Sequence, residues 1–133
     1  MSRYEDLSRE ELIRRLRDAE ASVRRCTADR EALRQSEERF RLFMDHSPTI
    51  AWIKDADGRY VYLSRSCEER YGIQRVDCYG KTDVELWPAA IAEKFRKNDL
   101  EVIARDQAIE VSEETVGADG ATRQWLNVKF PMR

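Results

Sequence analysis

The first 45 residues have the hydrophobic pattern of one long helix. They contain no glycine or proline and are rich in Arg, Glu, Leu and Ala, which favour helix. Ser8, followed three residues later by Glu11, has the spacing of a capping box and predicts where the helix begins. Pro48 predicts that it ends near His46, because the residue before a proline disfavours helical conformation. A helix of about 37 residues is long for a globular domain, so it needs a surface to pack against.

The apolar residues of this helix repeat with the heptad period of a coiled coil. When Leu16 and Val23 take a positions, every d position is apolar or small, although three of the five a positions are charged. Opposite charges at g and the following e position, as in Arg15 and Glu20, favour a parallel, in-register dimer. The alternative is a solvated helix whose narrow stripe packs on its own domain. The predicted dimer seam consists of Leu12, Leu16, Ala19, Val23, Cys26, Leu33 and Phe40.

After residue 46 the pattern changes to short strands, turns and helices. Residues 49–55 and 58–64 predict two strands joined by a turn at Asp57-Gly58. Residues 67–74 and 76–88 carry helical turns, and residues 89–106 form an amphipathic helix. Residues 108–116 and 122–132 alternate as two further strands.

This order of elements predicts the fold class. Helices grouped between two hairpins indicate an α+β domain with an antiparallel sheet, preceded by the long N-terminal helix. We therefore expect a helix or coiled-coil linker at residues 1–45 and a domain at residues 46–133.

Composition and charge narrow the classes of partner. The 24 Lys and Arg residues nearly balance 26 Asp and Glu, for a net charge of −2, so we expect no nucleic-acid partner. No apolar run approaches the 18–20 residues of a membrane span, and the N-terminus lacks a signal-peptide core. These features predict a cytoplasmic protein with no membrane span. Three cysteines without a CxxC pair predict reduced thiols and no zinc site.

The sequence carries no recognisable catalytic or metal-binding motif. A Gly-rich phosphate loop, HExxH and GxSxG are absent, and His46, the one histidine, precedes Ser47-Pro48 at a helix end. Asp55 and Asp57 flank a turn, where we expect them to hydrogen-bond the backbone rather than form an acid/base pair. We therefore predict no catalytic residue and no metal, with any enzymatic output outside this chain.

Five segments occur in an informative order: "SEERFRLFMDHSP", "IKDADGRYVYLSRS", "CEERYG", "YGKTDVELWP" and "DGATRQWLNVKFPMR". Together, over about residues 36–133, they resemble the PAS domain, a sensory module of bacterial signalling proteins. The fourth is similar to the G-K-[ST]-D segment that precedes the long PAS helix. The N-terminal helix is similar to the coiled-coil linkers that join PAS domains to neighbouring modules.

The resemblance also implies a missing strand. A PAS sheet has five strands, and the last in sequence lies centrally between the first and the fourth. Residues 122–132 resemble the fourth, so the fifth is expected to be missing from this chain. Either the chain is a fragment of a longer protein, or another segment, such as one from a partner chain, fills the gap. An open slot with two unpaired edges is costly, which predicts a perturbed or exchanged sheet.

The resemblance allows known cofactors to be tested by residue. Haem-binding PAS domains typically use a histidine on the long helix, but residues 89–106 contain none. The LOV-type flavin signature G-x-N-C-R-F-L-Q does not match "YGIQRVDCYGKTD". We therefore expect neither haem nor a LOV-type flavin, and the cofactor is unknown. The apolar interior either packs as a core or holds a small ligand. Alternation and helix face give Trp52, Phe95, Ile103, Leu126 and Val128 as candidate lining residues.

The resemblance implies a non-catalytic sensory or dimerisation module of a larger protein. That protein would be a sensor histidine kinase of a two-component system or a diguanylate cyclase. The implied partners are a second copy, bound through the N-terminal helix, and an unidentified small ligand. The parallel coiled coil would relay the signal by rotation or register change, which the charged a positions Arg30 and Glu37 would ease. The alternatives are a ligand-free interaction adaptor and a small α+β enzyme.

Overall fold

The computed structural model describes residues 7–133. Contacts divide the chain into two units, with the boundary between Phe43 and Met44. The expected domain ranges, 1–45 and 46–133, stay a prediction, and residues 1–6 of the first range lie outside the described residues.

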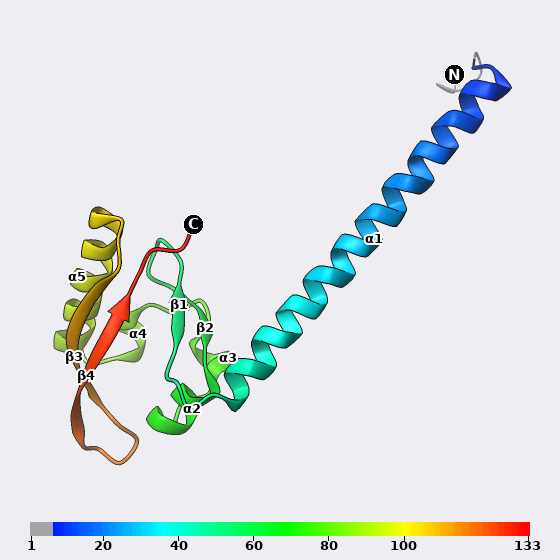
Figure 1. The fold of residues 1–133 in the computed structure, drawn as a ribbon. Helices are drawn as coiled ribbons and strands as arrows, with labels where there is room; N and C mark the ends of the chain where they lie inside the picture. Colours follow the sequence, from blue (N-terminus) through cyan, green and yellow to red (C-terminus); the bar gives the residue numbers. More distant parts are fainter. Residues whose placement is uncertain (1–6) are drawn as a thin grey trace. The chain divides into compact units, whose positions relative to one another are not determined.

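Helix α1, Arg9–His46, is one continuous helix of 38 residues (Figure 1). The Glu11 N–H donates a hydrogen bond of 3.2 Å to Ser8 Oγ, which gives the predicted cap at the helix start. Within α1 only Met44 is buried. The large apolar residues of the predicted seam are exposed, from 40% at Leu12 to 65% at Val23. The helix therefore presents an apolar stripe to its surroundings.

The second unit, residues 44–133, has the expected α+β order of two hairpins with helices between them (Figure 1). Its elements are β1 (Trp52–Lys54), β2 (Tyr60–Leu63), α2 (Arg65–Tyr71), α3 (Arg75–Cys78), α4 (Asp83–Leu86), α5 (Ala89–Arg105), β3 (Ile109–Val116) and β4 (Thr122–Lys129). The region of turn and helix-start signals at residues 76–88 holds most of one short helix, α3, and the whole of another, α4. They are separated by Gly80, whose φ of 79° breaks the helix.

The four strands form two separate antiparallel pairs, β1–β2 and β3–β4. Strands β1 and β4 lie on the facing sides of the two hairpins (Figure 1). The edges that they turn toward each other pair with no strand among residues 7–133. This is the position that the resemblance gives to the fifth strand, so the two-sheet arrangement agrees with that expectation. Side chains, rather than backbone hydrogen bonds, connect the two hairpins.

The first hairpin turns as its sequence predicts. Asp55 Oδ1 accepts hydrogen bonds from the backbone N–H groups of Asp57 and Arg59, at 3.0 and 2.9 Å. Gly58 takes a φ of 78°, a conformation that glycine adopts without strain. Asp55 is therefore a turn residue, as predicted.

The core of the second unit is built from strand β2 of this hairpin and from helices α2 and α3. Tyr60, Leu63, Cys67 and Cys78 form its buried cluster. Among the described helices, none is both long enough and apolar enough to cross a bilayer.

Candidate functional site

A cavity of about 50 Å³ lies within the second unit. Both hairpins and helices α2 and α5 contribute to its walls. Six aromatic side chains line it: Trp52, Tyr60, Tyr71, Trp87, Phe95 and Trp125. Because about 10–15 Å³ of such space holds one water, the cavity has room for a few waters or a small ring compound.

The structure brings two of the five predicted lining residues into this cavity. Trp52 and Phe95 are in its wall. Ile103, Leu126 and Val128 are not, and they are 52%, 74% and 57% exposed. Their expected placement in the interior is therefore wrong.

For β4 the sequence predicts an alternating strand, which the structure has, but the face that was taken as buried is the exposed one. Trp125, Asn127 and Lys129 point to the cavity, whereas Leu126 lies opposite Ser112 on the other face of the hairpin. Alternation separates two faces, but it does not say which is buried. On α5 the buried residues include Phe95 and Val102, and Ile103, one position further, is rotated away from that face.

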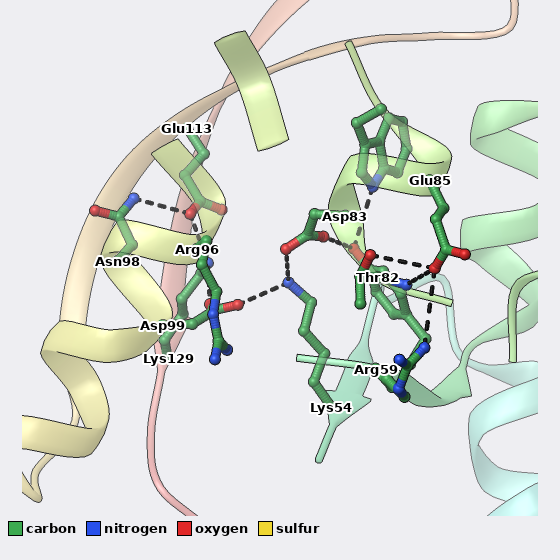
Figure 2. A network of polar contacts seen from close by, with 12 residues as sticks. Lys54, Arg59, Thr82, Asp83, Glu85, Arg96, Asn98, Asp99, Glu113 and Lys129 are labelled. Carbon is green, nitrogen blue, oxygen red and sulfur yellow. Dashed lines mark hydrogen bonds and ion pairs between the residues drawn. The ribbon is translucent and has the colours of Figure 1, made fainter. Parts of the chain in front are cut away.

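Figure 2 shows a network of polar contacts. Its residues Lys54, Glu113 and Lys129 are in the wall of the cavity. Lys54 Nζ lies 2.7 Å from Asp83 Oδ2 and 2.7 Å from Asp99 Oδ2. Lys129 Nζ lies 2.8 Å from Asp99 Oδ1 and 2.6 Å from Glu113 Oε1. Asp99 thus joins both ammonium groups, and through them it connects β1 of one hairpin to β4 of the other.

Hydrogen bonds extend the network at the Asp83 end. Tyr60 Oη donates to Asp83 Oδ1 at 2.7 Å, and Trp87 Nε1 donates to Tyr60 Oη at 3.2 Å. Burial, and next the Asp83 carboxylate, raise the pKa of the Tyr60 hydroxyl well above its ordinary value. Tyr60 therefore keeps its proton and acts as a donor.

Hydrogen bonds also extend the network at the Glu113 end. Asn98 Nδ2 and Asn127 Nδ2 donate to Glu113 at 3.0 and 2.7 Å. The Glu113 carboxylate therefore has several partners although it is removed from water, as a buried carboxylate requires.

Aromatic rings surround the two ammonium groups. Lys54 Nζ lies 4.8 Å from the Tyr60 ring centroid and 5.8 Å from that of Phe95. Lys129 Nζ lies 5.5 Å from the Phe95 centroid and 5.8 Å from that of Trp52. These are cation–π distances, so the rings attract both ammonium groups.

Sequence reasoning missed this network, although some of its signals are visible in the chain. Asp99 follows Phe95 by four residues and so shares its helix face. Lys129 follows Trp125 by four strand positions and so shares its strand face. Asp83 is the aspartate of the "GKTD" segment. Taking the face of Trp125, rather than that of Leu126 and Val128, as the inward face of β4 would have brought Lys129 inside.

The cysteines and acidic residues offer no assembled metal site in the part of the chain that the structure describes. Cys67 and Cys78 are buried free thiols, and Cys26 is exposed. Burial raises the pKa of the Cys67 thiol to about 12, so this lining residue stays protonated near neutral pH.

The family model described as the PAS fold matches residues 44–133. Two curated proteins also match. The methanogenesis regulatory histidine kinase FilI of Methanothrix harundinacea is 29% identical over 102 residues, which is 76% of this chain. The uncharacterized protein y4lL of Sinorhizobium fredii is 26% identical over 90 residues, or 68% of the chain. The chain spans 11% of the length of each of these relatives.

Two solved structures of VqmA from Vibrio cholerae are similar to this chain. The complex of VqmA with ligand and DNA has a TM-score of 0.61 and 30% identity. The VqmA dimer in the absence of target DNA, described in the context of LuxR-type receptors, has a TM-score of 0.60 and 31% identity. Each match covers 72% of this chain and 43% of the VqmA chain.

The similarity to VqmA in its complex with DNA corrects the expectation about nucleic acid. We predicted no nucleic-acid partner from a net charge of −2, and the similarity to a protein in complex with DNA overturns this prediction. Net charge averages over a whole chain, whereas DNA contact depends on where basic side chains cluster and on every domain of the protein.

Proposed function

Because the chain belongs to the PAS fold family of sensory signalling modules, we propose that its second unit senses a small molecule bound in the cavity. The observation that carries this proposal is the cavity itself, with aromatic walls and a few convergent polar groups. Small-molecule sites in proteins commonly have this composition. The proposal assigns no catalysis to the chain and places the module in the cytoplasm.

The competing proposal is an interaction adaptor whose cavity stays empty. A thermal-unfolding screen of small molecules separates the two, because a ligand that binds the folded state raises its midpoint. We expect some compounds to raise the midpoint of the wild-type chain but not that of Cys67→Leu, which adds volume at a lining position. Val84→Leu, at an exposed position, is the matched control. Equal effects on all three proteins, or no effect from any compound, would favour the adaptor.

We further propose that α1 forms a parallel homodimer. The heptad repeat and the exposed stripe of α1 support this, since an apolar stripe on a long helix is stable when a second helix covers it. Sedimentation of the chain at micromolar concentration tests the proposal. A monomer there would contradict it.

The ion pairs of Arg75 support a relay of the signal from the cavity to the last turn of α1. The Arg75 guanidinium lies 3.2 Å from Asp45 Oδ1 and 3.1 Å from Glu68 Oε2. Glu68 is on α2, the helix whose residues Cys67 and Tyr71 line the cavity. A shift of α2 on ligand binding would thus move the group that Asp45 contacts. Arg75→Met should then keep ligand binding but lose the signal response.

For the output of the whole protein we propose a histidine kinase, supported by the relative FilI. Autophosphorylation of the full-length protein with labelled ATP tests this. A ligand-responsive DNA-binding receptor is the second candidate, favoured by the similarity to VqmA. Its test is a mobility shift of genomic DNA fragments by the full-length protein, with and without a compound from the screen.

A further inference from the structure

The side chains around the cavity point to the chemical class of its ligand. We propose that the cavity takes a small, uncharged ring compound carrying a hydrogen-bond acceptor, which the ammonium groups of Lys54 and Lys129 bind. This rests on the proposed function, because it concerns the ligand of the same cavity.

The aromatic walls of the cavity favour a ligand with a flat, apolar ring. Tyr71 and Trp87 pack edge to face with ring centroids 5.1 Å apart, and Trp87 and Phe95 do so at 6.1 Å. Trp52 and Trp125 close the cavity from the two hairpins. Such rings favour another ring, packed either offset or edge-on, over a flexible chain. The volume of about 50 Å³ limits the ligand to a small one.

The two lysines supply donors to the ligand. An ammonium group has three N–H bonds. Among the described residues, Lys54 has two carboxylate partners, Asp83 and Asp99, and Lys129 also has two, Asp99 and Glu113. Each lysine therefore keeps one N–H for another acceptor, and both line the cavity with side chains that are 8% and 7% exposed.

The charges of the network favour a neutral acceptor. Two ammonium groups face three carboxylates, so the network carries a formal charge of −1 without a ligand. An anionic ligand would add a buried negative charge and compete with Asp99 and Glu113 for the lysines. A cationic ligand would lie beside two ammonium groups. A carbonyl, hydroxyl or ring nitrogen accepts the remaining N–H bonds without adding charge.

Three probes of nearly the same shape test the class: benzamide, benzoate and benzamidine, which are neutral, anionic and cationic near neutral pH. Toluene serves as the ring without an acceptor. We expect titration calorimetry on the full chain to show benzamide binding about tenfold more tightly than each of the others, the gain of one hydrogen bond to a charged donor.

Variants locate the effect at the lysines. Lys129→Met, combined with Glu113→Gln so that each remaining buried carboxylate of the network keeps a lysine partner, should reduce the preference for benzamide over toluene. Lys81→Met, at an exposed position outside the cavity, should keep it. If the cavity variant fails to fold, the comparison of the four probes on the wild-type chain still decides the proposal.

Tighter binding of benzoate or benzamidine, equal binding of toluene, or no binding of any of the four overturns the inferred class. The proposed function fails separately, when no compound of the thermal screen distinguishes wild type from Cys67→Leu.

Discussion

The Asp99 carboxylate joins Lys54 and Lys129 in the interior of the second unit. Asp99→Asn should lower the free energy of unfolding by about 3–5 kcal/mol, the usual cost of removing one partner from a buried ion pair. Urea denaturation measures this. Glu31→Gln, which removes an exposed carboxylate paired with Arg34 on α1, should leave the transition almost unchanged. A similarly small effect of Asp99→Asn would contradict the structural role of the network.

The Cys67 thiol makes the free energy of unfolding depend on pH in the alkaline range. Burial raises its pKa from 9.0 to about 12, so the folded state retains a proton that the unfolded state releases. Its contribution is complete below pH 9 and is lost as the pH rises from 9 towards 12. The urea midpoint of the wild-type chain should fall between pH 8 and pH 10, and that of Cys67→Ala should fall less steeply. If the urea midpoints of the wild type and of Cys67→Ala fell equally steeply with pH, the raised pKa of Cys67 would be contradicted.

At this scale the sequence predicted some residues and missed others for identifiable reasons. Asp55 was identified as a turn residue because its hydrogen bonds are local. Lys54, Asp83 and Asp99 come from β1, α4 and α5, and they meet only after the chain has folded. Local pattern does not report such contacts, and the rule that charged residues lie outside argues against them.

At the scale of elements, β4 shows what alternation determines. The pattern predicts a strand, and the strand forms, but the apolar face taken as buried carries Leu126 and Val128, which are exposed. The face with Trp125, Asn127 and Lys129 lines the cavity instead. The polar residues belong inside because the carboxamide and ammonium groups find partners there.

Two adjacent substitutions on β4 test this assignment. Trp125→Ala should lower the free energy of unfolding by about 3 kcal/mol, because it empties part of a packed wall. Leu126→Ala, one residue along on the exposed face, should change it by less than about 0.5 kcal/mol. Urea denaturation of both variants gives the comparison. Equal or reversed effects would contradict the assignment of the Trp125 face as the buried one.

Helix α1 carries the prediction about the relay. Arg30→Leu combined with Glu37→Leu replaces two charged a positions of the heptad pattern with the residue type that packs there. The proposed coiled coil should then gain thermal stability and lose freedom to change register, so the full-length protein should respond less to its signal. Circular dichroism and an output assay measure the two effects. An unchanged signal response would count against the relay.

At the scale of the whole molecule, the family and the α+β class could be predicted from the sequence, because they depend on the order of short segments that each fold locally. The arrangement of the strands in two pairs also follows from the expected gap beside β1 and β4. The nucleic-acid prediction failed at this scale, since a net charge averages over the chain and does not describe where basic side chains lie.

We propose that the signal binds in the cavity of the second unit. All three tryptophans of the chain, Trp52, Trp87 and Trp125, line this cavity. Their indole N–H signals in nuclear magnetic resonance spectra therefore report on it alone. Titration with benzamide, or with a compound from the thermal screen, should shift all three indole signals and, through Arg75, the backbone amide of Asp45. Indole signals that stay in place while the compound binds would show that it binds elsewhere, and would contradict the account.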